Sequence, residues 1–539
     1  MLFNSFSFWL FFIIVFALYC VLSHRWQNRF LLAASCFFYA WWVLSPALAA
    51  HKSALAASSA SYAWWEPYSP LWDIRHYRFV GLLLFTAGLD YFIGGRMAQF
   101  QDQSRRRGWL ILSLVSNLGV LALFKYFNFF ADSVYTTLNA CGLTVPRWEL
   151  QIILPVSISF YTFQSLAYTI DIYRGKLQPA RSLRDYLLFI SYFPHLVAGP
   201  INRPQSLLMQ CESPRRLTWE NWTQGAALIL FGLFKKIAVA DVLAPLADQA
   251  FTHPERCSSG ALLFGLYCFT FQIYADFSGY TDIARGLAKL MGFELMRNFD
   301  QPYFASNVTV FWRRWHISLS SWLRDYLYIP LGGNRLGKAR TFFNLFITMF
   351  LGGLWHGASW AFAFWGMLHG LYLAVHRLWL GGRKAADPAG TDTNFPAGTD
   401  TNLRPPGNWL SVPAGAIHAL KVLATFHLVA FGWIFFRAGS GSAAGGASSF
   451  ACASQYLRGL WPFGAHGHSF RFGSDQVGQA VAAIAALVLL IDIPQYLKRE
   501  HCVILTWRFG WRAAAFALLC VWLIMLRETE NVPFIYFKF

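Results

Sequence analysis

Charged side chains are scarce in this chain of 539 residues. Asp, Glu, Lys and Arg together make up 13% of it, against about 25% in ordinary soluble domains. Hydrophobic residues instead reach 56%, above the roughly 45–50% of soluble proteins. This composition excludes an ordinary water-soluble domain and predicts an all-α polytopic membrane protein.

Motifs for nucleotides, metals and nucleophilic serines are absent as well. The chain has no P-loop, no G-x-G-x-x-G, no H-E-x-x-H and no G-x-S-x-G. An ATPase, a dinucleotide enzyme, a zinc protease and a serine hydrolase therefore have no support. Nine cysteines lie mostly in apolar runs without C-x-x-C spacing, so neither a disulfide framework nor a metal site is expected. We expect no metal and no bound cofactor.

Apolar stretches near the ~20 residues that cross a bilayer recur along the chain. They predict about eleven to thirteen membrane helices, some of them short or re-entrant, in one domain over residues 1–539. The first stretch has no Lys or Arg before its apolar run and no small-x-small cleavage site, which favours a spanning helix over a signal peptide. The stretches lie at residues 1–20, 30–49, 79–95, 108–130, 152–172, 226–250, 260–275, 342–355, 358–380, 415–436, 477–493 and 511–526.

Basic residues predict the orientation in the membrane. Arg25 and Arg29 mark the first loop as cytoplasmic, and residues 105–107 mark the third. Lys498 and Arg499 mark the last loop in the same way, so both termini are predicted to lie outside the cytoplasm. The net charge of +18 then reflects topology and affinity for anionic membrane lipids, and nucleic acid is not expected as a partner.

Three segments are predicted to lie outside the membrane core. Residues 51–78 form an Ala/Ser-rich excursion on the outer face, with aromatics that would rest at the interface. Residues 381–411 contain two near-identical eight-residue units, 387–394 and 395–402. Such a polar, Pro/Gly-rich duplication cannot bury a core and is predicted to be flexible. Residues 528–539 end the chain as an aromatic tail.

The residues able to do chemistry gather between positions 276 and 335 and around His356. His356 lies in GGLWHG at residues 352–357, inside an apolar run, and a histidine at membrane depth needs a specific partner. Its imidazole, with an unperturbed pKa near ~6.5, could take a proton from an attacking hydroxyl. The alternative is a structural histidine that is hydrogen-bonded within the helix bundle.

His316, in FWRRWHISLS at residues 311–320, is the predicted companion of His356. Two such histidines can support acyl transfer, and the local charge and aromatic setting would favour a neutral His316 suited to orientation or oxyanion contact. A satisfied interfacial histidine is the alternative. Asp276 and Asp282 are costly if unpaired and are expected to anchor Arg or Tyr hydroxyl groups. The predicted substrate-binding residues are Arg313, Arg314, Trp315, Ser320, Arg324, Asp325, Trp355 and Asp276. Spacing alone leaves His369, His376 and His427 open as further candidates.

Two segments carry a family resemblance. FWRRWHISLSSWLRDYLYIPLGGNR at residues 311–335 and GGLWHGASWAFAFWGMLHG at residues 352–370 resemble the membrane-bound O-acyltransferase family. The similarity is to its bacterial branch, which O-acetylates alginate or peptidoglycan or D-alanylates teichoic acid. LPVSISFYTFQSLAYTIDIYRG from 154, YFPHLVAGPINRP from 192, GLFKKIAVAD from 232 and TFHLVAFGWIFFRA from 425 extend the resemblance over most of the chain. The insertion at 51–78 and the duplicated loop depart from the pattern.

The resemblance implies an inner-membrane ring of helices around a central tunnel, with acyl transfer toward an acceptor outside the cytoplasm; the loop charges place both termini in the periplasm. A cytoplasmic acyl thioester such as acetyl-CoA would be the donor. His356 matches the family's intramembrane histidine, and His316 matches its second active-site histidine. Tyr536 in the tail is similar to an aromatic-tyrosine motif whose hydroxyl is proposed to accept the acyl group before a periplasmic partner, SGNH-type or alginate-modifying, takes it. An interfacial aromatic anchor is the alternative for Tyr536.

The sequence therefore predicts a membrane O-acetyltransferase subunit for a cell-surface polysaccharide of the alginate type, with peptidoglycan as the alternative acceptor. A transporter or flippase for an envelope polymer precursor is the alternative of another class, because glycine-broken helices and midplane charges also suit permeation. Many transporters show paired interruptions in two halves, whereas the broken, histidine-bearing segments here cluster once, between residues 270 and 380. A scaffolding protein would not need two histidines with flanking glycines.

Overall fold

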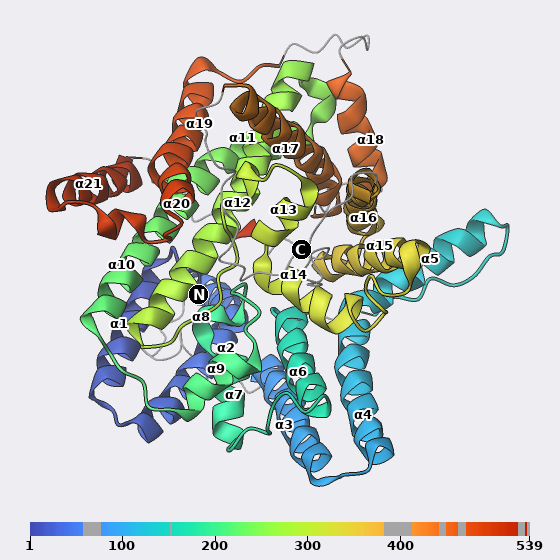
Figure 1. Ribbon diagram of the computed structural model, residues 1–539, viewed down its shortest axis with the longest axis vertical. Coiled ribbons are helices and arrows are strands. Elements are labelled where there is room, and N and C mark those ends of the chain that lie inside the picture. Colours follow the sequence, from blue (N-terminus) through green and yellow to red (C-terminus); the bar gives the residue numbers. More distant parts are fainter. Residues whose placement is uncertain are drawn as a thin grey trace. The chain divides into compact units, whose positions relative to one another are not determined.

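The structure of this chain, a computed structural model, describes residues 1–57, 77–150, 154–381, 412–440, 449–461, 470–525 and 534–535. Within these ranges the regular structure is helical, and the strand-like pairing is limited to one isolated bridge between Cys257 and Phe470. The all-α prediction is confirmed. The chain divides into two compact units, residues 1–222 with 287–295 and residues 223–286 with 296–539, whose helices are labelled in Figure 1.

Membrane-spanning character is clear in the described helices. Two short apolar helices, Phe6–Val21 and Phe509–Met525, coincide with the first and last predicted stretches. Other predicted stretches form shorter or interrupted helices, such as Ile158–Tyr173. The protein is therefore a multi-pass membrane protein. Five helical segments in the described ranges are long and apolar enough to cross a membrane: Arg78–Gln99, Gln103–Ala140, Ser259–Leu290, Gly415–Ser440 and Ser474–Lys498.

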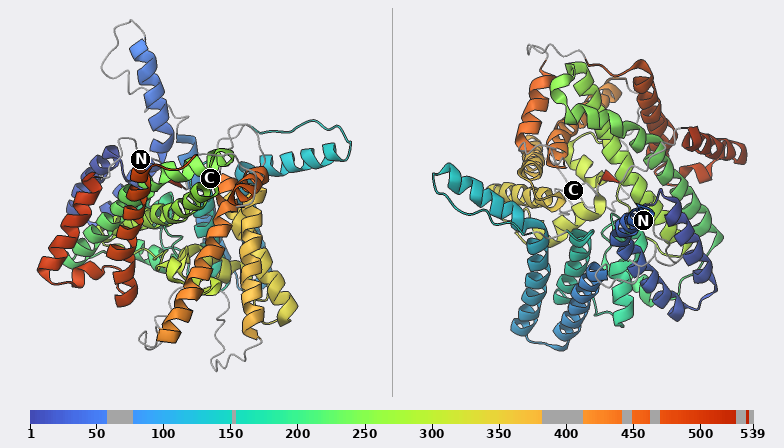
Figure 2. Two further views of the ribbon diagram at one scale, coloured as in Figure 1. Left: turned by 90° about the horizontal axis from the view of Figure 1, so that it is seen from above. Right: turned by 180° about the vertical axis from the view of Figure 1, so that it is seen from behind.

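A buried polar contact links two apolar helices of the first unit. Helices α3, α4 and α6 pack side by side (Figure 1), and α5 points away from them (Figure 2). Asp90 of α3, fully buried, accepts hydrogen bonds from Ser113 and Asn117 of α4 at 2.7 and 2.8 Å, which satisfies its carboxylate away from water. The elements are α1 Phe6–Val21, α2 His24–Ala57, α3 Arg78–Gln99, α4 Gln103–Leu121, η3 Ala122–Tyr126, α5 Phe127–Ala140, α6 Ile158–Tyr173, α7 Leu183–Ser191, α8 Phe193–Leu196 and α9 Pro204–Glu212.

Three predicted segments fall wholly or partly outside the described residues. Helix α2 continues through Ala57, seven residues into the predicted outer excursion, in keeping with the high helix propensity of alanine. Residues 58–76, the rest of that excursion up to the start of α3, are not described. The duplicated loop also lies outside the described residues, and so does the C-terminal tail apart from Phe534 and Ile535.

The second unit contains most of the residues singled out in the sequence. Its elements are most of α10 Trp219–Leu233, η4 Phe234–Ala240, α11 Asp241–Thr252, η5 Pro254–Arg256, most of α12 Ser259–Leu290, η6 Pro302–Phe304, α13 Val308–Arg314, α14 Ile317–Leu323, η7 Arg324–Tyr328, α15 Gly337–His356, α16 Trp360–Gly381, α17 Val412–Ser440, α18 Ser449–Leu460, α19 Ser474–Ala486, η8 Leu487–Asp492, α20 Ile493–Lys498, η9 Val503–Thr506 and α21 Phe509–Met525.

Helices α10 and α12 meet through glycines in the second unit. A Cβ added to Gly232 would lie 2.5 Å from the carbonyl oxygen of Gly279, and one added to Gly286 would lie 2.6 Å from that of Gly225. Each helix thus presents two glycines seven residues apart, so the two backbones stay in contact over two turns. The chain then enters the π-helical segment η4, whose lysines reach back to α12.

Candidate active site

The backbone at His316 is bent and held in place. Helix α13 ends at Arg314 and α14 begins at Ile317, and each has seven residues. The backbone N–H of Ile317 donates to the carbonyl oxygen of Asn298 at 2.9 Å, and that of Ser318 donates to the Asn298 side chain at 3.2 Å. His316 adopts a left-handed conformation with φ of +44°, which costs a non-glycine residue roughly 1–2 kcal/mol. Strain that surrounding bonds maintain is typical of functional sites.

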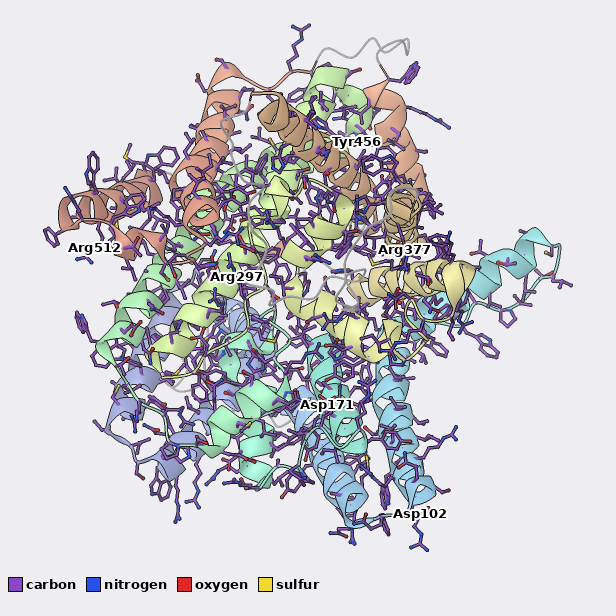
Figure 3. The ribbon with its side chains drawn as sticks, viewed as in Figure 1. Asp102, Asp171, Arg297, Arg377, Tyr456 and Arg512 are labelled. Carbon is purple, nitrogen blue, oxygen red and sulfur yellow. The ribbon has the colours of Figure 1, made fainter. Side chains whose placement is uncertain are left out.

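The loop before α13 supplies this support. Arg297, labelled in Figure 3, pairs with Asp300 at 2.7 Å. The backbone N–H of Asp300 in turn donates to the carbonyl oxygen of Arg314 at 3.0 Å. Residues 297–300 therefore fasten the last turn of α13 and, through Asn298, the first turn of α14.

The imidazole of His316 is enclosed by aromatic rings. Its exposed fraction is 0%, and its ring contacts Phe277 and Trp355 at centroid distances of 4.7 and 6.0 Å. Neither short helix beside it is among the helices long enough to span a membrane. Burial away from water lowers the pKa of His316 to about 3, so the ring is neutral near pH 7. A neutral imidazole offers one N–H donor and one acceptor nitrogen.

Glycines place His356 at the end of α15. A Cβ on Gly353 would lie 2.2 Å from the carbonyl oxygen of Phe362, and a Cβ on Gly366 would lie 2.2 Å from that of Met349. Helices α15 and α16 can therefore approach this closely only with glycine at both positions. Gly353 of the GGLWHG motif therefore serves the contact between the two helices. This contact fixes the position of His356 at the end of α15.

The structure brings His316 and His356 together. Their ring centroids are 6.3 Å apart, and Trp355 meets both rings edge to face at 6.0 and 5.1 Å. His356 is 6% exposed and also contacts the rings of Trp365 and Phe436 at 5.3 and 5.1 Å. A reacting carbonyl and its attacking hydroxyl placed between the two imidazoles could contact one ring each, which is the arrangement that an oxyanion donor and a general base require.

A small cavity opens beside His356. It leaves about 10 Å³ for the centre of a water molecule, room for roughly one water. Gly352 forms part of its wall, because a Cβ there would lie 3.1 Å from Cδ1 of Leu323. An acyl group is larger than a water molecule, so its entry requires these side chains to move. The lining residues are Trp312, Leu319, Ser320, Leu323, Met349, Gly352, His356 and Trp365.

The predicted substrate-binding residues fall into different environments. Ser320 lines the cavity, and its hydroxyl donates to the carbonyl oxygen of Trp315 at 3.1 Å. Trp315 is packed in the core, with its ring 4.9 Å from that of Trp433. Arg324 and Asp325 pair with each other at 2.7 Å. Trp315 thus acts through packing, and Arg324 carries its own counter-charge.

Arg313 and Arg314 are both half-buried. The guanidinium of Arg314 lies 5.1 Å from the centre of the Tyr496 ring. Its Nε and Nη1 atoms are buried and find no hydrogen-bond partner among the described residues. A buried guanidinium with free N–H groups is costly unless an anion or water accepts them, so Arg314 has donors left for a ligand.

Two lysines complete the polar part of the unit and were not assigned from the sequence. Lys235 Nζ lies 2.7 Å from Asp282, and Lys236 Nζ lies 2.7 Å from both Asp276 and Asp241. The prediction of Arg or Tyr hydroxyl partners was therefore wrong for Asp276. For Asp282 it was incomplete, because this carboxylate pairs with Lys235 and has Arg285 only at 3.7 Å. The GLFKKIAVAD segment held the signal, because two adjacent lysines in an apolar run need buried counter-charges.

Asp276 also holds the C-terminal tail. Its second carboxylate oxygen accepts a hydrogen bond from the backbone N–H of Ile535 at 2.7 Å. Phe534 and Ile535 are buried, at 1% and 3% exposed. Tyr536, the next residue, lies outside the described residues.

The remaining histidines of apolar runs have other surroundings. His369 is buried and accepts a long hydrogen bond from the Trp312 indole at 3.3 Å. His376 forms a hydrogen bond with Thr309 at 3.0 Å. His427 is exposed and forms a hydrogen bond with the hydroxyl of Tyr267 at 2.9 Å. Within the described ranges no group of three or more His, Cys, Asp or Glu side chains could hold a metal ion.

Comparison with known proteins gives the family. Residues 180–389 match MBOAT, the membrane-bound O-acyltransferase family. The probable alginate O-acetylase AlgI of Pseudomonas aeruginosa is 40% identical over 440 residues, which cover 81% of this chain and 72% of the relative. This chain belongs to the membrane-bound O-acyltransferase family. The corresponding protein of Pseudomonas putida is 34% identical over the full length of both chains, and the peptidoglycan O-acetyltransferase of Helicobacter pylori is 34% identical over 68% of each.

Membership of this family settles the class of activity. The protein is a multi-pass membrane acyltransferase, as the two motif segments predicted, and both segments around the histidines lie inside the matched range 180–389. The transporter and scaffold interpretations lose their support, because relatives over most of the chain are named as acyltransferases.

Proposed function

We propose that this protein takes an acetyl group from a cytoplasmic thioester, acetyl-CoA foremost, and passes it across the inner membrane for O-acetylation of a cell-surface polysaccharide. The observation that carries the proposal is the pairing of two buried imidazoles, with ring centroids 6.3 Å apart, in a family of acyltransferases. Relatives named for alginate O-acetylation cover more of the chain than the peptidoglycan relative, which favours an alginate-type acceptor.

The proposed chemistry assigns a separate role to each histidine. His356 takes the proton of the attacking hydroxyl as its oxygen forms a bond to the thioester carbonyl carbon. His316, neutral because it is buried, donates its N–H to the oxygen that becomes negatively charged. The carbon–sulfur bond then breaks, and the thiolate recovers the proton from His356. No metal and no bound cofactor takes part in this scheme.

Arg314 supports the proposed donor. Its buried Nε and Nη1 atoms have no hydrogen-bond partner among the described residues, and a guanidinium pairs well with phosphate oxygens. We assign these donors to the anionic part of the acyl thioester. Arg324, which already pairs with Asp325, has less to offer such a ligand.

The attacking hydroxyl belongs, in this proposal, to Tyr536. Ile535 is fixed on Asp276 at 2.7 Å, so the backbone is anchored to α12 one residue before the tyrosine. A phenol with a pKa near ~10 is a weak nucleophile by itself and needs a base such as His356. The acetyl-tyrosine would then pass its acetyl group to a periplasmic SGNH-type or alginate-modifying partner, which acts on the polysaccharide. This route requires the C-terminus to lie in the periplasm, as the loop charges predict.

Replacing His356 tests the proposal. We expect His356→Ala to lower polysaccharide acetylation by a factor of about 10²–10⁴, because a general base is lost. The measurement is the acetyl content of the polymer in cells that carry equal amounts of parent or variant protein in the membrane.

His427→Ala is the matched control. It also removes a histidine from an apolar run, but this side chain is exposed and bonded to Tyr267. Acetylation should stay near the parental level in the control. If His356→Ala keeps acetylation within a few-fold of the parent, His356 is not the base and the proposed chemistry fails.

A further inference from the structure

Helix α12 carries two buried carboxylates that are paired in the same way. Asp276 and Asp282 lie six residues apart, both are 3% exposed, and each accepts from one of the consecutive lysines of η4 at 2.7 Å. Their surroundings differ at the other carboxylate oxygen. The second oxygen of Asp282 forms a hydrogen bond with the ring of His501 at 3.0 Å. The second oxygen of Asp276 accepts a hydrogen bond from the backbone N–H of Ile535.

The tail is seated on more than one contact. The ring of Phe534 lies under the ammonium group of Lys236, 4.5 Å from its centre, and meets the ring of Tyr280 edge to face at 4.8 Å. Tyr280 lies one helical turn after Asp276, so both project from the same face of α12. Lys236 therefore serves the tail twice, by holding the Asp276 carboxylate and by contacting Phe534.

One helix connects this seat to the histidine pair. Phe277 follows Asp276 directly in α12 and packs against His316 with a centroid distance of 4.7 Å. The anchor of the tail and the wall of the active site are thus adjacent residues of a single turn. A shift of Ile535 along α12 would therefore change the distance from the point where the tail is anchored to His316.

We propose that Asp276 is a positioning residue: its carboxylate, held by Lys236, docks the tail through the Ile535 N–H and sets the reach of Tyr536 toward the two histidines. The docking itself stands on the contacts above, and its consequence for turnover rests on the proposed function. Backbone recognition suits this task, because it fixes the register of the tail without using the side chain that reacts.

Carboxypeptidase digestion of the full-length protein in detergent, followed by intact mass, measures docking without any activity assay. In the parent we expect trimming to stop before Ile535. Asn has one acceptor oxygen where Asp276 has two, and its NH₂ group is a donor. In Asp276→Asn this NH₂ group must face either the ammonium of Lys236 or the N–H of Ile535, which are donors themselves. Either the bond to Ile535 or the bond to Lys236 is therefore lost. Loss of a hydrogen bond to a charged group should speed trimming past Ile535 roughly tenfold or more.

Asp282→Asn is the matched control, because it also breaks a buried carboxylate–lysine pair on α12 but leaves the tail contact. Its trimming should stop where that of the parent stops. Ile535→Pro removes the donated N–H, fixes φ at residue 535 and should release the tail as Asp276→Asn does. Because carboxypeptidases release proline poorly, release in this variant is measured as chymotrypsin cleavage after Tyr536 or Phe537, with the parent and Asp276→Asn digested in parallel. The two changes should not add in the double variant, and Ile535→Val, which keeps the N–H, should be protected like the parent.

Turnover separates docking from relay. Asp276→Asn should lower kcat for acetyl transfer and leave KM for the donor unchanged, since the proposed function assigns donor binding to Arg314 and not to the tail anchor. Parental trimming in Asp276→Asn, or equal release in Asp282→Asn, would overturn the docking role. Full kcat in Asp276→Asn with a released tail would overturn the positioning role. If Tyr536→Phe keeps parental turnover and a protected tail, the relay of the proposed function fails while the docking of the tail on Asp276 stands.

Discussion

His316 combines two features that a histidine adopts only when the surrounding structure compensates for them. Its backbone is left-handed, and its imidazole is removed from water. The backbone N–H groups of the next two residues, Ile317 and Ser318, donate to Asn298 and hold the left-handed backbone in place. The ring of Phe277 packs against the imidazole. The side chain and the backbone can therefore be tested separately.

At the residue scale, His316→Asn should fold and lose activity. Asparagine tolerates the left-handed region better than most residues, so its thermal unfolding midpoint in detergent should exceed that of His316→Ala, whose backbone costs roughly 1–2 kcal/mol there. Both variants should lose acetyl transfer by about 10²–10³-fold in kcat if the imidazole is an oxyanion donor.

The pH dependence gives a second readout of the same prediction. With its pKa lowered to about 3, His316 is neutral at every pH above ~5. Above pH ~5, the plot of kcat against pH should therefore have the same shape for His316→Asn as for the parent, including the fall in activity toward acidic pH. A limb near pH 6.5 that disappears in His316→Asn would show that this imidazole titrates during the reaction and would contradict its neutral role.

At the scale of elements, the α10–α12 crossing decides whether the buried charges can pair. Lys235 and Lys236 reach α12 because Gly232 and Gly279 let the two backbones touch. Leaving one of the carboxylates buried without its lysine costs on the order of 3–5 kcal/mol. The glycines thus matter for the lysine pairs as well as for helix packing.

Gly232→Ala should separate these helices and destabilise the protein. A Cβ there would lie 2.5 Å from a backbone oxygen, and overpacking of this kind costs about 1–3 kcal/mol. Gly260→Ala, on the partner helix α12 but with nothing within 4 Å of the new Cβ, is the control and should keep the parental unfolding midpoint in detergent. Equal midpoints for the two variants would mean that the backbones have room to move apart freely.

At the scale of the whole molecule, the connection between α16 and α17 is predicted to be a spacer. Deleting residues 387–402 removes both repeated units and leaves fourteen residues between Gly381 and Val412, which can span up to about 46 Å. Expression and acetylation should stay near parental levels, because the repeat has no apolar face to bury. Immunoblots of membranes and polymer acetyl content measure the two.

A Gly/Ser replacement of the same sixteen residues is the control for that deletion, since it keeps the length of the connection and discards its sequence. Loss of activity in the deletion but not in the replacement would indicate that only length matters. Loss in both would show that the repeat itself has a function, and would contradict the spacer prediction.

The sequence by itself determined the membrane class, the helical fold and the family. These follow from local properties: apolar runs set the environment, and the FWRRWH and GGLWHG segments lie inside the range that matches the family. The glycines beside His356 were visible too, although their helix partner Phe362 was not, because a glycine shows that something approaches closely without showing what.

Tertiary structure alone decided which residues surround the pair. Asp276 and Ile535 are 259 positions apart and meet through a backbone N–H, which leaves no trace in side-chain patterns. The pairing of each α12 carboxylate with its own lysine, Asp282 with Lys235 and Asp276 with Lys236, depends on how α10 and α12 cross. The left-handed turn at His316 is likewise imposed by Asn298 from another segment, since residues with an L-configured Cα do not prefer it.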